Sequence, residues 1–134
     1  YFEINSRTNG KSMSDISGNS IYDIARAKWG GSWRMPTKAE LKELDSKCEW
    51  QWITQNGNKG YKVVGPNGNS IFLPATGYRL DLLLYNARED GYYWSSTPYE
   101  SDDDNAYGMF FYSSHSAVYW YYRHSGYCVR PVSE

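Results

Sequence analysis

The chain has 134 residues, a formal net charge of -1 and an aromatic content of 18%. That length suits one compact domain, so we expect residues 1–134 to form a single domain. The near balance of acidic and basic residues lacks the basic patch of nucleic-acid-binding proteins, and no stretch approaches the roughly 18 apolar residues of a membrane span. These features exclude a nucleic acid partner and direct membrane insertion from the expected functions.

A first helix is predicted over residues 20–29, where apolar residues recur at helical spacing. The residues in this pattern are Ile21, Ile24, Ala25 and Trp29. Three preceding polar residues are candidate N-caps, namely Ser17, Asn19 and Ser20. The pair Gly30-Gly31 ends the helix.

A second helix is predicted from a capping box, the strongest local signal in the chain. Thr37 and Glu40 form the Thr-x-x-Glu pattern directly after Pro36. The helix is expected to bury Leu41, Leu44 and Cys48. Two short helices ahead of a strand-rich remainder predict an α+β fold, with the helices flanking a mainly antiparallel twisted sheet that has long loops.

Strand-like patterns begin at Trp50. A hairpin is predicted between residues 61–64 and 71–74, because Gly65 to Asn69 contains an Asn-Gly turn signal. Further strands are expected at residues 92–96, 106–112, 117–122 and 127–132. Residues 80–91 contain four leucines and fit either a helical turn or an exposed apolar loop, and the second option would favour a contact with a neighbouring domain or subunit.

Parts for catalysis are missing from the sequence. His115 and His124 are the only histidines, and they lack the i,i+4 spacing that places two imidazoles on one metal. No Gly-rich phosphate loop or Gly-x-Ser-x-Gly elbow is present, so we expect no enzyme, no cofactor and no metal site. Cys48 and Cys128 fit a disulfide or two buried thiols, and the thiols are favoured because cysteine is often a small core residue.

Glu100 to Asn105 forms the densest group of oxygen ligands in the chain. Calcium prefers such oxygens, but the segment lacks the glycine and the terminal glutamate of an EF-hand loop. A solvated acidic loop is therefore the favoured interpretation.

Residues 99–127 are dominated by Tyr, Ser, Asp, Asn and His. The run from Tyr119 to Tyr122 places aromatic rings on both faces of a predicted strand, so one face presents rings to something other than the core. Exposed rings beside short polar side chains are typical of protein interfaces, and the same rings can stack on sugars.

Several segments, taken in order, resemble a known family. They are Gly30 to Thr37, Glu40-Leu41, Gly65 to Pro74, Tyr93 to Thr97, and Gly126 with Val129 to Val132. This combination resembles the major paralogous domain of Fibrobacter and Bacteroides surface proteins, which is related to the formylglycine-generating-enzyme branch of the C-type-lectin fold. The resemblance implies a C-type-lectin-like fold. The paired cysteines and the multi-histidine site of the branch's catalytic members are not matched.

The tail also resembles the variable region of proteins diversified by retroelements. That resemblance implies a framework of Trp94, Ser95, Arg123, Gly126, Val129 and Arg130. It implies exposed ligand-binding positions within residues 99–127, and together with the composition of the tail these are Tyr99, Asp102, Asp104, Tyr107, Tyr112, Ser114, His115, Tyr119, Tyr121, His124 and Tyr127.

The function expected from the sequence is therefore that of a non-catalytic adhesin domain outside the cell or on its surface, alone or within a larger surface or pilus protein. Its partner would be a protein or glycan on another cell or on a phage or host surface. A phage receptor-binding tip and a structural envelope module without a ligand are the alternatives.

Overall fold

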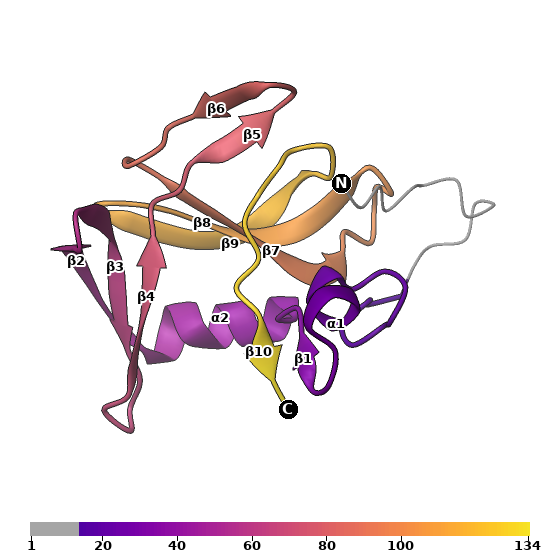
Figure 1. The fold of residues 1–134 in the computed structure, drawn as a ribbon, viewed down its shortest axis with the longest axis horizontal. Coiled ribbons are helices and arrows are strands. Elements are labelled where there is room, and N and C mark those ends of the chain that lie inside the picture. The colour runs from indigo at the N-terminus through magenta and orange to yellow at the C-terminus, as the bar shows by residue number, and fades with distance from the viewer. Residues whose placement is uncertain (1–13) are drawn as a thin grey trace.

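A computed structural model describes residues 14–134, which form two helices and ten strands (Figure 1). The helices are α1 (Ile24–Trp29) and α2 (Lys38–Lys47). The strands are β1 (Trp33–Arg34), β2 (Glu49–Gln55), β3 (Asn58–Val64), β4 (Ser70–Pro74), β5 (Tyr78–Leu80), β6 (Leu83–Tyr85), β7 (Gly91–Pro98), β8 (Asn105–Tyr112), β9 (His115–Tyr122) and β10 (Val132–Ser133). The predicted α+β class, with mostly antiparallel strands and two helices, is confirmed.

The sequence suggested a single mainly antiparallel sheet, but the strands do not share one sheet. They form four antiparallel sheets, with the orders β1-β10, β2-β3-β4, β5-β6 and β7-β8-β9. The β7-β8-β9 sheet lies at the centre, α2 covers its lower face, and the β5-β6 ribbon stands above its upper face (Figure 1). This arrangement leaves the two faces of the central sheet with different neighbours.

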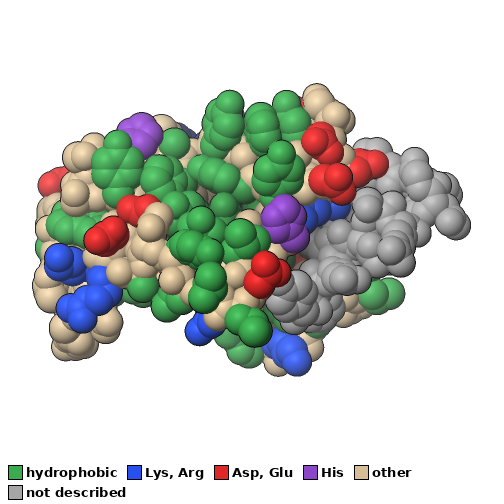
Figure 2. Space-filling model, turned by 90° about the horizontal axis from the view of Figure 1, so that it is seen from above, with side chains coloured by type: hydrophobic (Ala, Val, Ile, Leu, Met, Phe, Trp, Pro, Cys, Tyr) green, Lys and Arg blue, Asp and Glu red, His purple; other side chains and the backbone are tan. Residues whose placement is uncertain are grey.

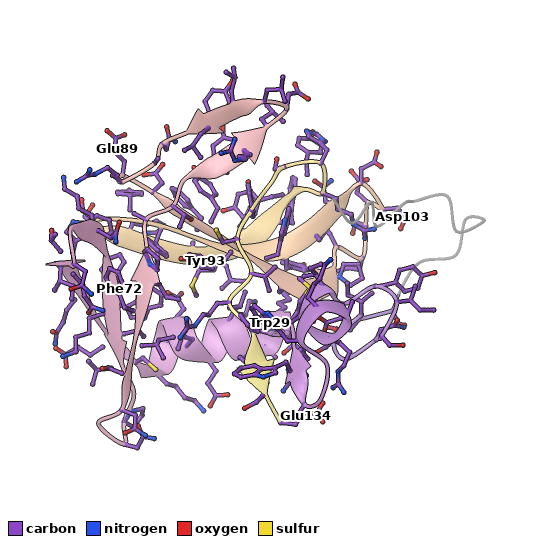
Figure 3. The ribbon with its side chains drawn as sticks, viewed as in Figure 1. Trp29, Phe72, Glu89, Tyr93, Asp103 and Glu134 are labelled. Atoms are coloured by element: carbon purple, nitrogen blue, oxygen red, sulfur yellow. The ribbon has the colours of Figure 1, made fainter. Side chains whose placement is uncertain are left out.

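The main core lies between the central sheet and α2. Tyr93 points into this space (Figure 3), and Met109 and Phe111 of β8 are fully buried. Aromatic rings surround Phe111, with Tyr61 at 5.3 Å and Tyr93 at 5.9 Å between ring centroids. Edge-to-face and offset ring pairs of this kind stabilise a core beyond the burial of their area. The lower face of the sheet is therefore the core face.

Helix α1 differs in detail from the sequence prediction. It begins at Ile24, and its N-cap is Asp23, whose side chain accepts hydrogen bonds from the backbone N–H groups of Ala25 and Arg26. Asp23 is fully buried and also accepts from Gly18 N and Met35 N. The predicted caps were wrong because this carboxylate serves the helix and two neighbouring loops together.

Helix α2 confirms the predicted capping box. The Thr37 hydroxyl accepts from Glu40 N at 3.2 Å, and the Glu40 carboxylate accepts from Thr37 N at 2.9 Å. Arg34 binds the same carboxylate through two nitrogens, at 2.8 and 2.7 Å. These contacts hold the start of α2 against β1.

The remaining strands confirm most of the predicted pattern. The β3-β4 hairpin pairs Val63 with Ile71 around the predicted turn. The four leucines of residues 80–84 lie in the β5-β6 ribbon and not in a helical turn, and Leu82 at its tip is 92% exposed, while a separate turn at residues 86–90 leads to β7. Residues 127–132 are largely irregular, because only Val132 belongs to a strand and Cys128 makes one isolated bridge to Tyr93.

Candidate functional site

Side chains of β9 alternate between the core and the upper face of the central sheet. Ser116 reaches down to Asp45 of α2, with 2.5 Å between their side-chain oxygens, and Val118 packs on the core. Because neighbouring residues of a strand point to opposite faces, Tyr119 and Tyr121 point upward. The cross-strand register places Phe110 opposite Ala117 on that upper face. The expected presence of rings on both faces of β9 follows from this alternation.

The upper face carries a continuous set of rings, which we call the aromatic face. Its members are Tyr78, Tyr92, Trp94, Phe110, Tyr112, His115, Tyr119, Tyr121 and Tyr127. Tyr92 is central, since its ring lies 4.8 Å from Tyr78, 5.0 Å from Phe110 and 4.9 Å from Tyr127. Seen from above, hydrophobic side chains gather on this surface and two histidines lie among them (Figure 2).

A groove of about 900 Å³ continues the aromatic face at one end. Rings from separate parts of the chain line it, including Tyr78, Trp94 and Tyr127. Leu84 of the β5-β6 ribbon contributes an apolar wall, and His124 a polar one. A concave surface that combines rings with a few polar groups is the usual form of a ligand site.

The predicted positions fall into separate groups. Tyr112, His115, Tyr119, Tyr121 and Tyr127 belong to the aromatic face. Asp104, His124 and Tyr127 line the groove. Ser114 lies in the exposed turn between β8 and β9. The structure thus brings seven of these positions onto the aromatic face and groove, and leaves Tyr99, Asp102, Tyr107 and Ser114 elsewhere.

The expectation that Tyr107 is exposed was wrong. Its side chain is buried on the α2 side of the sheet, where its hydroxyl is 3.1 Å from Glu100 and the Lys38 ammonium sits 3.4 Å from its ring centroid. Tyr99 is half-buried on the same side and stacks on Trp120, with centroids 5.0 Å apart. Position 107 belongs to the inward set of β8, as do Met109 and Phe111.

The side chains of Tyr121 and Tyr127 are half-buried. Their buried parts pack within the domain, so both residues belong partly to the framework. Burial raises the pKa of the Tyr121 hydroxyl to about 12 and raises that of Tyr127 further. Tyr119 is different, because 55% of its surface is exposed. His124 is exposed too and stacks on Tyr122 with centroids 5.3 Å apart.

Asp102 organises the acidic loop through hydrogen bonds to its own segment. One of its oxygens accepts from Asp104 N at 2.9 Å and the other from the Asn105 amide at 2.8 Å. Such bonds are typical of an Asx turn. Asp103 projects at the end of the sheet (Figure 3). Among residues 14–134, no group of three or more His, Cys, Asp and Glu side chains is arranged to hold a metal ion.

Framework residues that also line the groove hold the tail in place. The Ser95 hydroxyl donates to the Tyr107 carbonyl at 2.7 Å, and Arg123 Nε donates to the Asn105 carbonyl at 3.0 Å. Arg79 and Gly126 exchange two backbone hydrogen bonds, at 2.9 and 2.6 Å. Both cysteines are free and half-buried, and Cys128 Sγ lies 3.2 Å from the Thr76 hydroxyl. Most of these contacts depend on backbone groups and not on exposed side chains.

Sequence reasoning missed the residues that the β5-β6 ribbon and β7 bring to the site. Tyr78, Leu84 and Tyr92 precede residue 99, so an argument confined to the tail could not include them. The available signal was the apolar run from Leu82 to Leu84, whose exposed interpretation is confirmed by exposures of 51% or more.

Neither helix in residues 14–134 has the length and apolar character of a membrane-spanning segment. Comparison with curated proteins and with solved structures gave no match. The family model of the Lcl C-terminal domain matches residues 7–133, almost the whole chain, which indicates a surface or binding type of module. The chain therefore belongs to the Lcl C-terminal domain family.

Proposed function

We propose that this chain is a non-catalytic, surface-exposed ligand-binding domain that contacts its ligand through the aromatic face and the adjoining groove. The observation that carries the proposal is the exposure of rings on the side of the central sheet that faces away from the core, where Tyr119 is more exposed than Tyr112. Exposed aromatic clusters of this kind are uncommon on surfaces without a partner.

The division between framework and exposed positions supports a diversified binding surface on a C-type-lectin-like fold. Ser95 and Arg123 donate to backbone carbonyls of the tail, and Gly126 exchanges backbone hydrogen bonds with Arg79 of β5. Substitution at Tyr119, Tyr122 or His124 would leave those contacts in place, because these three side chains are exposed. A tail built in this way tolerates the changes that a retroelement introduces.

An adhesin role follows from the same surface. The rings offer stacking area to a protein or a sugar, and His124 with Asp104 offers hydrogen bonds in the groove. A location outside the cell agrees with this role, and so does assembly into a larger surface or pilus protein.

The proposal is tested with Tyr119→Ala and His124→Ala, using a glycan array and a library of phage-displayed peptides as probes. Both variants should lose the ligands that the unmodified protein selects while they keep its melting temperature, since exposed side chains contribute little to stability. Trp29→Ala is the matched control, because Trp29 is 60% exposed and lies beside β10 (Figure 3).

Two outcomes would count against a binding role. Loss of stability without loss of binding would favour a structural module, and unchanged binding by both variants would remove the aromatic face from the site. The diversification part is tested separately, by a search of the neighbouring genes for a reverse transcriptase and for a near-copy of the tail's coding sequence.

A further inference from the structure

Strand β9 forms one edge of the central sheet, and no other strand of residues 14–134 pairs with it there. The opposite edge, along β7, is covered by the C-terminal segment. Trp94 N donates to Cys128 O at 2.9 Å, and Cys128 N donates to Tyr92 O at 3.0 Å. Within residues 14–134, the β7 edge of the central sheet is therefore covered and the β9 edge is not.

The register shows which backbone groups of β9 point away from β8. A two-residue turn joins the strands, Tyr112 pairs with His115, and Arg123 N donates to Asp104 O at 2.9 Å. In an antiparallel hairpin with a two-residue turn, the pair of residues next to the turn is hydrogen-bonded. Along the two strands, hydrogen-bonded pairs then alternate with pairs that are not hydrogen-bonded. Odd-numbered residues of β9 thus bond to β8. Ser116, Val118 and Trp120 direct their N–H and C=O groups outward.

Strand β9 lacks the features that usually protect a sheet edge. It pairs with β8 over eight residues without a register shift. Its sequence, from His115 to Tyr122, contains no proline, aspartate, glutamate, lysine or arginine. Soluble proteins commonly place charges, prolines or bulges on such an edge to prevent the addition of another strand. This edge is open to strand addition.

The outward groups match a polypeptide better than a sugar. They repeat every two residues, at about 6.8 Å, which is the spacing of an extended backbone. A neighbouring strand can satisfy each N–H and C=O in turn, as in peptide recognition by strand addition.

Charged residues of α2 distinguish between two candidates for the added strand, which are a second copy of β9 and a strand of another protein. Lys38, at the start of α2, lies over Tyr107, which pairs with Trp120 near the end of β9. Asp45, near the end of α2, bonds to Ser116 near the start of β9. Helix α2 therefore runs antiparallel to β9. Lys42 lies between Lys38 and Asp45 on α2 and is exposed, near the level of Val118. Antiparallel pairing of two copies of β9 about Val118 would bring the two Lys42 side chains together, whereas an acidic side chain on a foreign strand would complement Lys42.

We propose that the open edge of β9 binds an extended segment of a protein partner as an added strand, with an acidic side chain of that segment facing Lys42. This inference rests on the proposed function, which it narrows from a protein or glycan ligand to a protein. The rings of the aromatic face then contact the upward side chains of the added strand.

The test uses eight-residue peptides selected on the purified protein from a phage-displayed library. Backbone amide exchange should slow at Val118 and Trp120 when a selected peptide binds, and stay unchanged at Tyr119, whose amide already bonds to β8. Val118→Pro removes one outward donor and should weaken binding at least about tenfold. Lys42→Glu should weaken the binding of acidic peptides about fivefold. The control Lys28→Glu, at an exposed position of α1, should not.

Several results would overturn strand addition. They are the failure to select any peptide, binding without protection of the Val118 and Trp120 amides, and a dimer that Val118→Pro converts to a monomer, which would assign the edge to a second copy. The proposed function has its own readout. If Tyr119→Ala abolishes binding to a glycan while the edge amides stay unprotected, that function stands and this inference fails. If neither Tyr119→Ala nor Val118→Pro weakens any probe, both fail.

Discussion

Trp94 and Tyr127 stack face to face, with ring centroids 4.4 Å apart and ring planes 23° from parallel. Trp94 belongs to β7, and Tyr127 lies in the irregular segment after β9. The stack fastens that segment to the central sheet beside the groove, where both rings form part of the lining. A residue of the tail thus has a structural role as well as a place in the proposed site.

Tyr127→Ala should lower the free energy of unfolding by about 3 kcal/mol, as large-to-small changes at packed aromatic positions do. Tyr127→Phe keeps the stack on Trp94 and should cost less than about 1 kcal/mol. Urea denaturation of the two variants measures the difference. Equal stability of the Ala and Phe variants would show that the stack does not hold the tail.

Gly91→Ala should destabilise the core. A Cβ atom at Gly91 would lie 2.0 Å from the ring of Phe111, which is fully buried and has no room to move. Forcing an extra methyl group into a packed core costs about 1–3 kcal/mol. Gly57→Ala is the control, because its Cβ meets no atom within 4 Å, although its positive φ costs about 1 kcal/mol. Thermal unfolding that ranks Gly57→Ala as the more damaging change would contradict this packing.

Stability in acid should depend on Glu40. The hydrogen bonds from Arg34 lower the pKa of the Glu40 carboxyl to about 2, from an ordinary value of 4.5. Because the folded state favours the ionised form, this contribution is present above pH 4.5 and is lost as the pH falls toward 2. The expected contribution of the ionised Glu40 to the free energy of unfolding is small, since the carboxylate is partly exposed.

Glu40→Gln should therefore reduce the change in the free energy of unfolding between pH 4.5 and about 2. Urea unfolding at several pH values measures this change. Glu43→Gln is the control, because Glu43 pairs only with Lys47 on the exposed side of α2. A pH profile unchanged by Glu40→Gln would assign the acid dependence to other carboxylates.

Stability in alkali should depend on Tyr121. Burial raises the pKa of its hydroxyl to about 12, so the unfolded state releases this proton first as the pH rises above 10. Stability is then lost between pH 10 and 12, and Tyr121→Phe should reduce that loss. Absorbance titration of the tyrosinates and unfolding at each pH measure it. Tyr112→Phe, at an exposed ring, is the control, and an equal effect of the two changes would contradict the buried state of Tyr121.

Local sequence signals predicted the elements whose structure is determined locally. The Thr37 and Glu40 capping box defined α2, and the Asn-Gly turn defined the β3-β4 hairpin, because backbone and side-chain bonds within a few residues hold them. The start of α1 was mispredicted because Asp23 is selected by contacts with Gly18 and Met35 as well as by the helix. Three of the four sheets join strands that follow one another in sequence, and only the β1-β10 pair depends on long-range pairing.

The candidate site was predictable only in its C-terminal half. Alternation along residues 119–122 predicted rings on both faces of the strand, but composition alone could not show that Tyr107 faces α2. The contribution of Tyr78 and Leu84 depends on the β5-β6 ribbon folding over the central sheet, which no local pattern in residues 99–127 records.

The reciprocal backbone bonds between Arg79 and Gly126 anchor the tail without using any side chain. Positions 119, 122 and 124 can therefore be randomised together in a synthetic repertoire, and most members should still fold. Such a repertoire would make the domain a small, disulfide-free platform for selecting new affinity reagents.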